Sequence, residues 1–583
     1  MSGKGPAPDS RPASRARREP PISEYDVALT QGVVLEASAA VGAPFRGASA
    51  PVTERATRYP VVIPERAEPS LAPARIRELH GALARHRLLG RLLWRSLEVL
   101  PGLIALAVIT SPFWAGAFLP LPLAIAVLTF DAYWLYLSVS NAYRSFVGAR
   151  RMQSAMRTDF HRQYRAAAVF GQVHLRWEDV RHVIIIPNYK EPIGILRRTL
   201  DSIVAQEVAR QCIVVLAMEE RDPAAREKAE LLLREYRGRM GDIFATFHPA
   251  GLPGEIAGKS SNEAWAAREA HRRLCMNGLY DVRRLTVTSC DADTVFHPKY
   301  FSALTYKFVT DLHRYRRFWQ SPILLYNNIW QVPAPLRVPS SLSGLHILSN
   351  LVKRDRMVFP QSTYSLSFRM AVDVGFWDTD VVPEDWHMFL KCFYAFRGDV
   401  EVEPIFLPTG NDAVNTGRFV GTLKGAYQQH VRHAWGASDI PYALVQSVLH
   451  PEIPRWKRFR RAMALTGNHI TWATHWFILS LGWFIPDVIA HLFGVGASPT
   501  WLPATARVLL TACLLPYAVM IYTNRRLRPP RAQRWTWWYR LYDAVHWALL
   551  PVTSLLMSTL PALEAQFRLA IGKRLEYRVT PKT

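Results

Sequence analysis

Residues 99–130 form an apolar run without one charged side chain, and this run restricts the possible folds more than any other feature. A helix crosses the hydrocarbon core of a bilayer with about 20 apolar residues. Pro120 and Pro122 interrupt the run, so we predict two membrane helices joined near Pro120, the second ending at about Tyr143. Asp131 lies in the second helix, and a carboxylate in the middle of a bilayer costs roughly 2.5 to 3.5 kcal/mol. We therefore expect Asp131 to face protein rather than lipid.

Three further uncharged stretches follow near the C-terminus, at residues 462–486, 508–524 and 544–563. The first two predict a second membrane hairpin. The third contains Pro551 and Pro561, and we expect it to be a re-entrant or interfacial segment, because a full crossing would separate the basic tail from the other basic segments. A complete crossing is the alternative.

Basic residues gather beside these apolar runs. The chain has 71 Lys and Arg against 47 Asp and Glu, a net charge of +24, and basic clusters lie at residues 144–165 and 525–540. Such clusters beside apolar runs are typical of cytoplasmic loops. We therefore predict a multi-pass protein of the plasma (inner) membrane with its middle region in the cytoplasm. The membrane, and not nucleic acid, is the expected partner of this charge.

The remaining composition excludes two other classes of protein. The five cysteines form no C-x-x-C pair and leave one unmatched, so we expect no disulfide framework. The N-terminus has no apolar core of a signal peptide, and its richness in Pro, Arg, Ala and Ser predicts disorder over residues 1–72.

Between the apolar runs, strands alternate with helices. Residues 183–186 and 212–216 are short β-branched apolar runs, and residues 193–208 between them have helical spacing. A third run, residues 285–289, leads directly into Cys290-Asp291-Ala292-Asp293. This alternation predicts an α/β fold with a mostly parallel, Rossmann-like sheet covered by helices. Ligands of such sheets bind at the carboxyl ends of the strands.

Asp291 and Asp293 follow the third strand, so both carboxylates can reach the same crevice. Hard oxygen ligands suit Mg²⁺ or Mn²⁺, which also share their coordination with substrate phosphates. The pair therefore predicts a metal site that binds a nucleotide diphosphate. The alternative is a turn in which the two residues only cap a helix.

Two further polar elements flank this pair in sequence. Lys259, after Gly258 and at the start of a predicted helix, can offer its charge and backbone N–H groups to phosphate. Glu384 and Asp385 follow a turn, and one of these carboxylates can serve as a general base while the other binds the backbone or a basic neighbour. The alternatives are a loop with a helix cap and ordinary surface charge.

A last polar element, residues 428–436, precedes the return of the chain to the membrane. Arg432 can bind a diphosphate with two hydrogen bonds, and Trp435 offers a flat face to a sugar ring. An interfacial helix with an aromatic anchor is the alternative interpretation.

The order of these elements resembles the membrane-bound family 2 glycosyltransferases, which include cellulose, chitin and hyaluronan synthases. The resemblance covers about residues 180–445 and implies a GT-A fold. It implies that Asp291 and Asp293 bind the metal and the donor diphosphate, and that Asp385 deprotonates the acceptor. It also implies a substrate site that includes Glu191, Lys259, Asn262, Glu384, Gln429, Arg432 and Trp435.

The chain departs from the family pattern at two places. Ala217-Met218-Glu219-Glu220 stands where the family has D-D or D-G, and His433 replaces the Trp of Q-x-x-R-W, with Trp435 two positions later. The second departure and the few helices predicted outside the GT-A domain lead us away from a synthase that secretes a long polymer.

We therefore predict an inverting, metal-dependent transfer from a nucleotide sugar, expected to be a UDP-sugar, to a glycan or lipid-linked acceptor. The alternatives are a polyprenyl-phosphate sugar transferase and, from another class, a non-catalytic transporter or scaffold. The expected segments are a disordered terminus (1–72), an interfacial helix (73–97), a hairpin (98–143), a basic linker helix (144–180), the GT-A domain (181–445), an interfacial segment with two membrane helices (446–524) and a basic loop, bent segment and tail (525–583).

Overall fold

The computed structural model describes residues 87–353, 358–494, 499–531, 536–573 and 575. The expected disordered segment 1–72, residues 73–86 of the expected interfacial helix and residues 576–583 of the basic tail lie outside this part of the chain.

A seven-stranded sheet with the order β3-β2-β1-β4-β8-β6-β9 forms the middle of the chain. All neighbouring strands are parallel except for the two pairs that contain β8. The predicted α/β fold with a mostly parallel sheet is confirmed. The strands are β1 Arg181–Asn188, β2 Cys212–Glu219, β3 Asp242–His248, β4 Leu285–Ser289, β6 Arg317–Gln320, β8 Tyr364–Ser367 and β9 Glu401–Pro404, and a small sheet contains β5 Val295–Phe296, β7 Ile323–Leu324 and β10 Thr409–Gly410.

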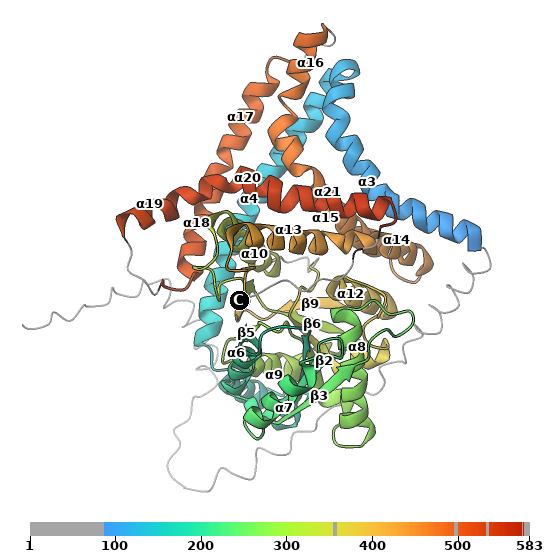
Figure 1. Cartoon of the computed structure of the whole chain (residues 1–583), viewed down its shortest axis with the longest axis vertical. Helices are drawn as coiled ribbons and strands as arrows, with labels where there is room; N and C mark the ends of the chain where they lie inside the picture. The colour runs from blue at the N-terminus through green and yellow to red at the C-terminus, as the bar shows by residue number, and fades with distance from the viewer. Residues whose placement is uncertain (1–86, 354–357, 495–498, 532–535, 574, 576–583) are drawn as a thin grey trace, which may run out of the picture. The chain divides into compact units, whose positions relative to one another are not determined.

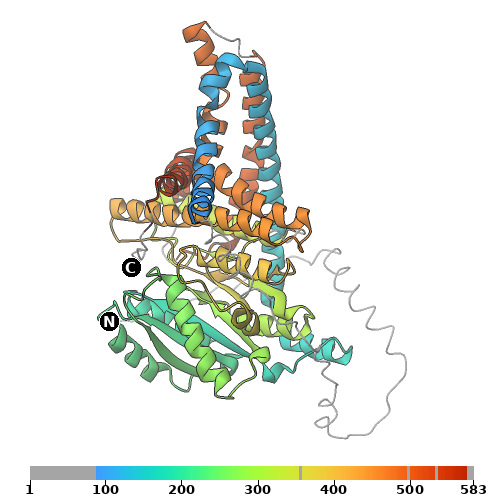
Figure 2. The same ribbon diagram turned by 90° about the vertical axis from the view of Figure 1, so that its right-hand side faces the viewer.

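Helices cover both faces of the large sheet because the strands are apolar on both sides. Val183 and Ile185 of β1 belong to a buried cluster with α8 (Lys259–His271) and α12 (Glu384–Ala395). Ile184 and Ile186 belong to a second cluster with α6 (Ile193–Val204), α7 (Ala225–Tyr236) and α9 (Tyr300–Thr310). Figure 2 shows α8 lying across one face of the strands.

The register brings the carboxyl ends of four strands to the same edge. Asn188 of β1 is opposite Met218, and Glu219 of β2 is opposite His248. Ser289, the last residue of β4, is opposite Ile185 of β1. The loops after β1, β2, β3 and β4 therefore meet at this edge, where the sequence predicts the ligand site.

Within the described ranges, four helical segments are long and apolar enough to cross a membrane: Leu88–Phe118, Pro120–Arg157, Leu502–Leu527 and Trp537–Ala570. The first two correspond to α3 (Arg87–Phe118) and α4 (Pro120–Arg157), which are separated only at Leu119. Both helices extend further than we expected, since α3 continues unbroken through residue 98 and α4 through residue 144. Asp131 of α4 is fully buried, as expected of a carboxylate that faces protein.

The C-terminal helices differ from the two crossings expected over residues 446–524. Helix α15 (Arg455–Leu481), which contains most of the uncharged stretch 462–486, is not among the four segments, while α17 (Leu502–Ala512) and α18 (Leu514–Leu527) together form one. The last segment consists of α19 (Trp537–Val545), α20 (Leu550–Ser554) and α21 (Leu560–Ala570). Pro551 and Pro561 stand in the first turns of α20 and α21, where a missing N–H is tolerated. These three helices run across the direction of α3 and α17 (Figure 1).

Hydrogen bonds join this last segment to the rest of the chain. Arg95 of α3 donates to the carbonyl oxygens of Leu569 (2.8 Å) and Ala570. Gln566 Nε2 of α21 donates to the carbonyl oxygen of His469 in α15 (2.8 Å), so α21 contacts both a candidate membrane helix and α15.

Candidate active site

Asp291 and Asp293 lie in the loop after β4, but their side chains have different environments. The Asp291 side chain is 27% exposed, and its Oδ1 lies 2.9 Å from Nζ of Lys259. Asp293 is fully buried, and its Oδ2 accepts a hydrogen bond from the backbone N–H of Asp412 at 2.7 Å. Asn411 Nδ2 donates to the other oxygen of Asp293 at 3.4 Å. Asp291 is therefore the more accessible of the two carboxylates.

Lys259, the first residue of α8, connects the two acidic motifs. Its Nζ lies 2.9 Å from Asp291 Oδ1, 2.8 Å from Glu384 Oε1 and 3.8 Å from Glu263 Oε1. Burial would lower the pKa of Lys259, but these three carboxylates outweigh it and hold the pKa well above its usual value. Lys259 is thus a buried cation in contact with three carboxylates.

Glu384 and Asp385 are the first two residues of α12. Glu384 contacts Lys259, while Asp385 Oδ2 accepts a hydrogen bond from the backbone N–H of Ser362 at 3.0 Å. Asp385 Oδ1 accepts from the N–H of Trp386 at 2.8 Å. Burial, and then the charge of Glu384, raises the pKa of Asp385 to about 7. A carboxylate with this pKa is well suited to accept a proton near neutral pH.

Ser362 joins both motifs and was not predicted from the sequence. Its backbone N–H donates to Asp385, its hydroxyl donates to Asp291, and its carbonyl oxygen accepts from Lys259 Nζ at 2.9 Å. The residue has a φ of 51°, in the left-handed region that few residues other than glycine adopt. No local pattern in the run Gln361-Ser362-Thr363 distinguishes it from an ordinary polar loop.

A buried charged cluster behind α12 was also missed. His387 Nδ1 lies 2.8 Å from Asp439 Oδ1, and its Nε2 lies 3.0 Å from Asp378 Oδ2. Lys391 Nζ, one turn later in α12, is 2.5 Å from Asp378 Oδ1. Burial would lower the pKa of His387, but the two carboxylates raise it to about 10. Because Ser260 of α8 also donates to the carbonyl oxygen of Asp378 at 2.5 Å, this cluster holds α12 against α8.

Glu191 and Asn262 contact backbone and loop atoms at the same edge of the sheet. Glu191 Oε2 accepts from the N–H of Tyr189 (2.6 Å) and from Asn188 Nδ2 (2.9 Å), which braces the loop after β1. Asn262 Nδ2 donates to the carbonyl oxygen of Ala217 (2.8 Å), which fixes α8 to β2.

Gln429 and Arg432 lie on α13 (Phe419–Ala434), and Trp435 lies directly after it. Trp435 is buried in the apolar cluster that contains Phe389 of α12. The imidazole ring of His469 contacts residues near the end of α13 and at the start of α12. Its centroid lies 5.6 Å from the ring centroid of Trp386 in α12. On the other side, a Cβ added to Gly436, two residues after α13, would lie 3.1 Å from His469 Nε2.

Residues 286–524 match the family described as "Glycosyl transferase family group 2". The chain carries a family 2 glycosyltransferase domain. This match confirms the family and the enzyme class expected from the sequence, and it includes Asp291, Asp293, Asp385 and Arg432. It begins within β4, so Glu191 and Lys259 lie outside it. No match was found among curated protein sequences.

Solved structures of other glycosyltransferases resemble this one loosely. The mannosyltransferase PcManGT from Pyrobaculum calidifontis, in complex with GDP-Man and Mn²⁺, has a TM-score of 0.37 and 13% identity over 77% of this chain and 100% of its own. GalNAc-T7 with UDP, GalNAc and Mn²⁺ scores 0.28 at 10% identity, over 54% of this chain and 58% of its own. TarS of S. aureus scores 0.27 at 10% identity, over 61% and 57%. At these scores no residue role is transferred from them.

The protein ligands available for a metal ion in this glycosyltransferase are few. Among the described residues, no group of three His, Cys, Asp or Glu side chains is arranged to hold an ion. Asp291 nevertheless offers a partly exposed carboxylate, and Asp293 lies two residues away. This donor set fits a hard divalent cation that takes its remaining ligands from a diphosphate and water.

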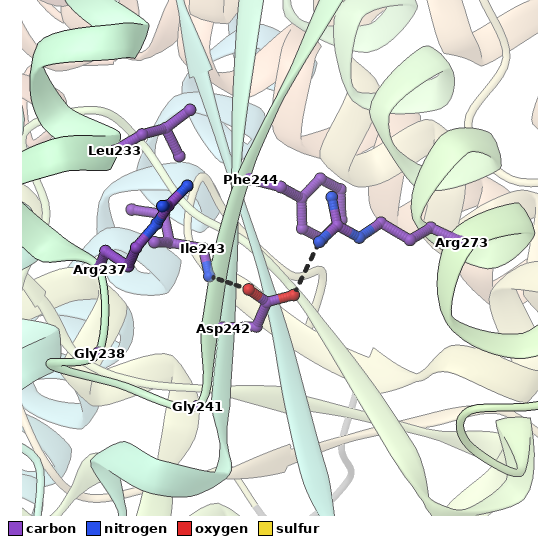
Figure 3. A pocket seen from close by; sticks show the side chains of 8 residues that line it. All are labelled: Leu233, Arg237, Gly238, Gly241, Asp242, Ile243, Phe244 and Arg273. Atoms are coloured by element: carbon purple, nitrogen blue, oxygen red, sulfur yellow. Dashed lines mark hydrogen bonds and ion pairs between the residues drawn. The ribbon is translucent and has the colours of Figure 1, made fainter.

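A cavity of about 250 Å³ beside the large sheet lies away from this site. It is at the amino end of β3, between Arg237 and Arg273, and Asp242 in its wall lies 3.2 Å from Arg273 (Figure 3). Since the acidic motifs stand at the carboxyl edge of the same sheet, we do not assign this cavity to the substrates.

Proposed function

We propose that this glycosyltransferase moves a sugar from a nucleotide-diphosphate sugar to a hydroxyl acceptor in a single inverting displacement. The observation that carries the proposal is the contact of Ser362 with both Asp291 and Asp385, because one residue then spans the expected donor site and the expected base. We expect the donor to be a UDP-sugar and the acceptor to be a glycan or a lipid-linked sugar.

Asp385 accepts the proton of the acceptor hydroxyl as the oxygen attacks the anomeric carbon. A positioned base of this kind contributes about 10²- to 10⁴-fold to the rate. The raised pKa of Asp385 leaves it both deprotonated and sufficiently basic near neutral pH. A single base with no separate nucleophile predicts inversion, and therefore a β-linkage from an α-linked donor.

Lys259 supplies the positive charge that faces the departing nucleotide diphosphate. It remains charged because three carboxylates surround it, and a fixed cation in a buried site stabilises developing negative charge more strongly than a solvated one. Asp291 and Asp293 would hold Mg²⁺ or Mn²⁺, which when bound neutralises the diphosphate of the donor.

Arg432 and Gln429 are proposed to contact the donor, and Trp435 to support the acceptor side. The support for these roles is an indirect contact between two elements. Gly436 of η6 (Trp435–Ser438), the short helix after α13, lies against His469, and His469 contacts Trp386 at the start of α12. Glu191 is proposed to shape the nucleotide site by bracing the loop after β1, and Asn262 by holding α8 against β2.

We place the protein in the plasma (inner) membrane with the glycosyltransferase domain in the cytoplasm. The four apolar segments and the basic residues at the ends of α4 and α18 support this location. We do not expect the secretion of a long polymer, since His433 replaces the Trp of the family pattern.

The test is a nucleotide-release screen of the purified full-length protein with UDP-, GDP- and dTDP-sugars, each with Mg²⁺, Mn²⁺ or EDTA. Release that needs a sugar acceptor supports the proposal, and mass analysis of the product separates single addition from a polymer. Release with polyprenyl phosphate as the sole acceptor would instead identify a polyprenyl-phosphate sugar transferase. Absence of release with every donor would favour a non-catalytic transporter or scaffold.

A further inference from the structure

A cavity of about 120 Å³ lies between α4 and α18, far along the chain from the residues assigned to catalysis. The two helices pack along each other and are side by side in Figure 1. The cavity is near their C-terminal ends, where both helices change from apolar to basic sequence. Its lining residues are Phe146, Ala149, Arg150, Gln153, Tyr522, Thr523 and Arg526.

The charge around this cavity is strongly unbalanced. Residues 144–157 of α4 include four arginines and no acidic residue, and residues 525–528 include three arginines. Of these, Arg528 forms a pair of hydrogen bonds with Asp543, at 2.8 and 2.9 Å. Arg150 and Arg526 lie over aromatic rings instead, 5.5 Å from Phe146 and 5.7 Å from Tyr522. Within the described part of the chain, neither has an ion pair with a carboxylate. The residues that line the cavity therefore include two arginines and no carboxylate.

An apolar stripe leads to each of these arginines. On α4, Val139 and Tyr143 are exposed and lie on the same face as Phe146 and Arg150, at helical spacings of four, three and four residues. On α18, Leu515, Val519 and Tyr522 are exposed and lead to Arg526 with the same spacing. Both stripes end at the basic side of the candidate membrane segments Pro120–Arg157 and Leu502–Leu527.

We infer that this cavity binds the phosphate headgroup of an anionic phospholipid, with Arg150 and Arg526 on the phosphate and the acyl chains along the two apolar stripes. Basic pockets between membrane helices at the cytoplasmic surface recognise such headgroups. Gln153 and Thr523 provide polar atoms for the glycerol region. A free phosphate ion would satisfy the two arginines but would leave the stripes uncovered. The inference rests on the proposed location of these helices in a membrane, and it is independent of the proposed transfer reaction.

The test uses the full-length protein in detergent, without donor or acceptor, and measures its melting temperature and its lipid stoichiometry by native mass spectrometry. Phosphatidylglycerol should raise the melting temperature and remain bound, while phosphatidylcholine and inorganic phosphate should do neither. The double variant Arg150→Gln/Arg526→Gln should bind phosphatidylglycerol roughly 30-fold more weakly, since each basic residue near a charged lipid contributes about 1 kcal/mol.

A matched control comes from the neighbouring residues of the same helices. The variant Arg151→Gln/Arg525→Gln also removes one positive charge from each helix, at the residue after Arg150 in α4 and at the residue before Arg526 in α18. Neither Arg151 nor Arg525 lines the cavity. It should retain the affinity of the wild-type protein. Equal losses in both double variants would overturn the inference, because diffuse attraction between charges would then explain the binding.

Two other outcomes would also overturn it. One is unchanged binding of phosphatidylglycerol to Arg150→Gln/Arg526→Gln, and the other is an equal rise in melting temperature with inorganic phosphate alone, which would assign the site to a free anion. The catalytic variant Asp385→Asn should bind the lipid normally. Loss of transfer activity and loss of lipid binding are therefore distinguishable.

Discussion

Ser362 donates its backbone N–H to Asp385 at 3.0 Å from a left-handed conformation with a φ of 51°. The same residue donates its hydroxyl to Asp291. Backbone in this region is uncommon outside glycine and costs about 1 to 3 kcal/mol, so the surrounding structure must hold Ser362 in place. We interpret Ser362 as a positioning residue that orients the proposed base relative to the proposed donor site.

Two substitutions distinguish the contribution of the Ser362 hydroxyl from the contribution of its backbone conformation. Ser362→Ala removes the contact with Asp291 and keeps the constraint on the backbone, whereas Ser362→Gly also permits the loop to relax. We expect kcat to fall about tenfold in the Ala variant and further in the Gly variant, with little change in the KM of the donor. Steady-state nucleotide release measures both constants. Wild-type kcat in Ser362→Gly would contradict the positioning role.

The base assignment predicts a particular pH profile. The raised pKa of Asp385 means that transfer should increase about tenfold per pH unit below about 7 and level off above it, because only the carboxylate accepts the proton. Asp385→Asn should lower kcat by about 10²- to 10⁴-fold and remove this limb. Rates across pH 5 to 9 provide the measurement. An unchanged limb in Asp385→Asn would assign it to another group.

The same shift predicts an effect on stability. The pKa of Asp385 in the folded state, about 7, lies above its ordinary value of 3.8. Between these two pH values the folded state therefore binds more protons than the unfolded state. As the pH rises through this window, Asp385 lowers the free energy of unfolding. Asp385→Asn should therefore melt at a higher temperature than the wild-type protein at pH 8, and the difference should shrink toward pH 4. Thermal unfolding at the two pH values is the measurement, and an equal difference at both would contradict the prediction.

Lys259 should matter for both folding and donor binding. Lys259→Gln leaves Asp291, Glu384 and Glu263 without their shared cation, and breaking a buried pair in this way costs about 3 to 5 kcal/mol. The melting temperature should fall and the donor KM should rise. Lys299→Gln is a suitable control, because Lys299 donates to the carbonyl oxygen of Thr158 at 2.9 Å. Similar behaviour of the two variants would contradict the proposed role.

Asp291→Asn and Asp293→Asn should differ in stability. Asp291 is partly exposed, so its substitution should abolish turnover with little change in melting temperature. Asp293 is buried and accepts the backbone N–H of Asp412, so Asp293→Asn should lower both turnover and melting temperature. Unfolding curves with and without Mn²⁺ are the measurement. Equal loss of stability in the two variants would contradict this division.

Three of the seven strands of the large sheet could be predicted from local patterns, because the β-branched runs before Pro187, Ala217 and Asp291 each form a strand. Asp291, Lys259 and Glu384 could be proposed as one site for the same reason: the loops that carry them follow strands or open helices at one edge. Ser362 and His387 could not. Their roles depend on contacts between distant segments, and neither residue belongs to a local pattern that differs from a polar loop or a helix surface.

The helices outside the sheet were harder to predict. Residues 462–486 carry no formal charge, yet His469 and His475 lower the average hydropathy of α15, and the helix begins with the basic residues Arg455 to Arg461. Lack of charge alone therefore does not identify which helices are apolar enough to cross a membrane. The break near Pro120 was easier to place, because proline lacks the N–H that a helix interior requires. The segment Trp537–Ala570, in contrast, stays helical through Pro551 and Pro561.

The ion pair between Lys259 and Asp291 would make the proposed metal and nucleotide sites interdependent. Lys259 Nζ lies 2.9 Å from Asp291 Oδ1, so a divalent cation bound at Asp291 would share this carboxylate with the ammonium group. A diphosphate that attracts Lys259 would weaken the ion pair. The proposed function therefore implies that Mg²⁺ or Mn²⁺ binds more tightly together with the nucleotide than alone.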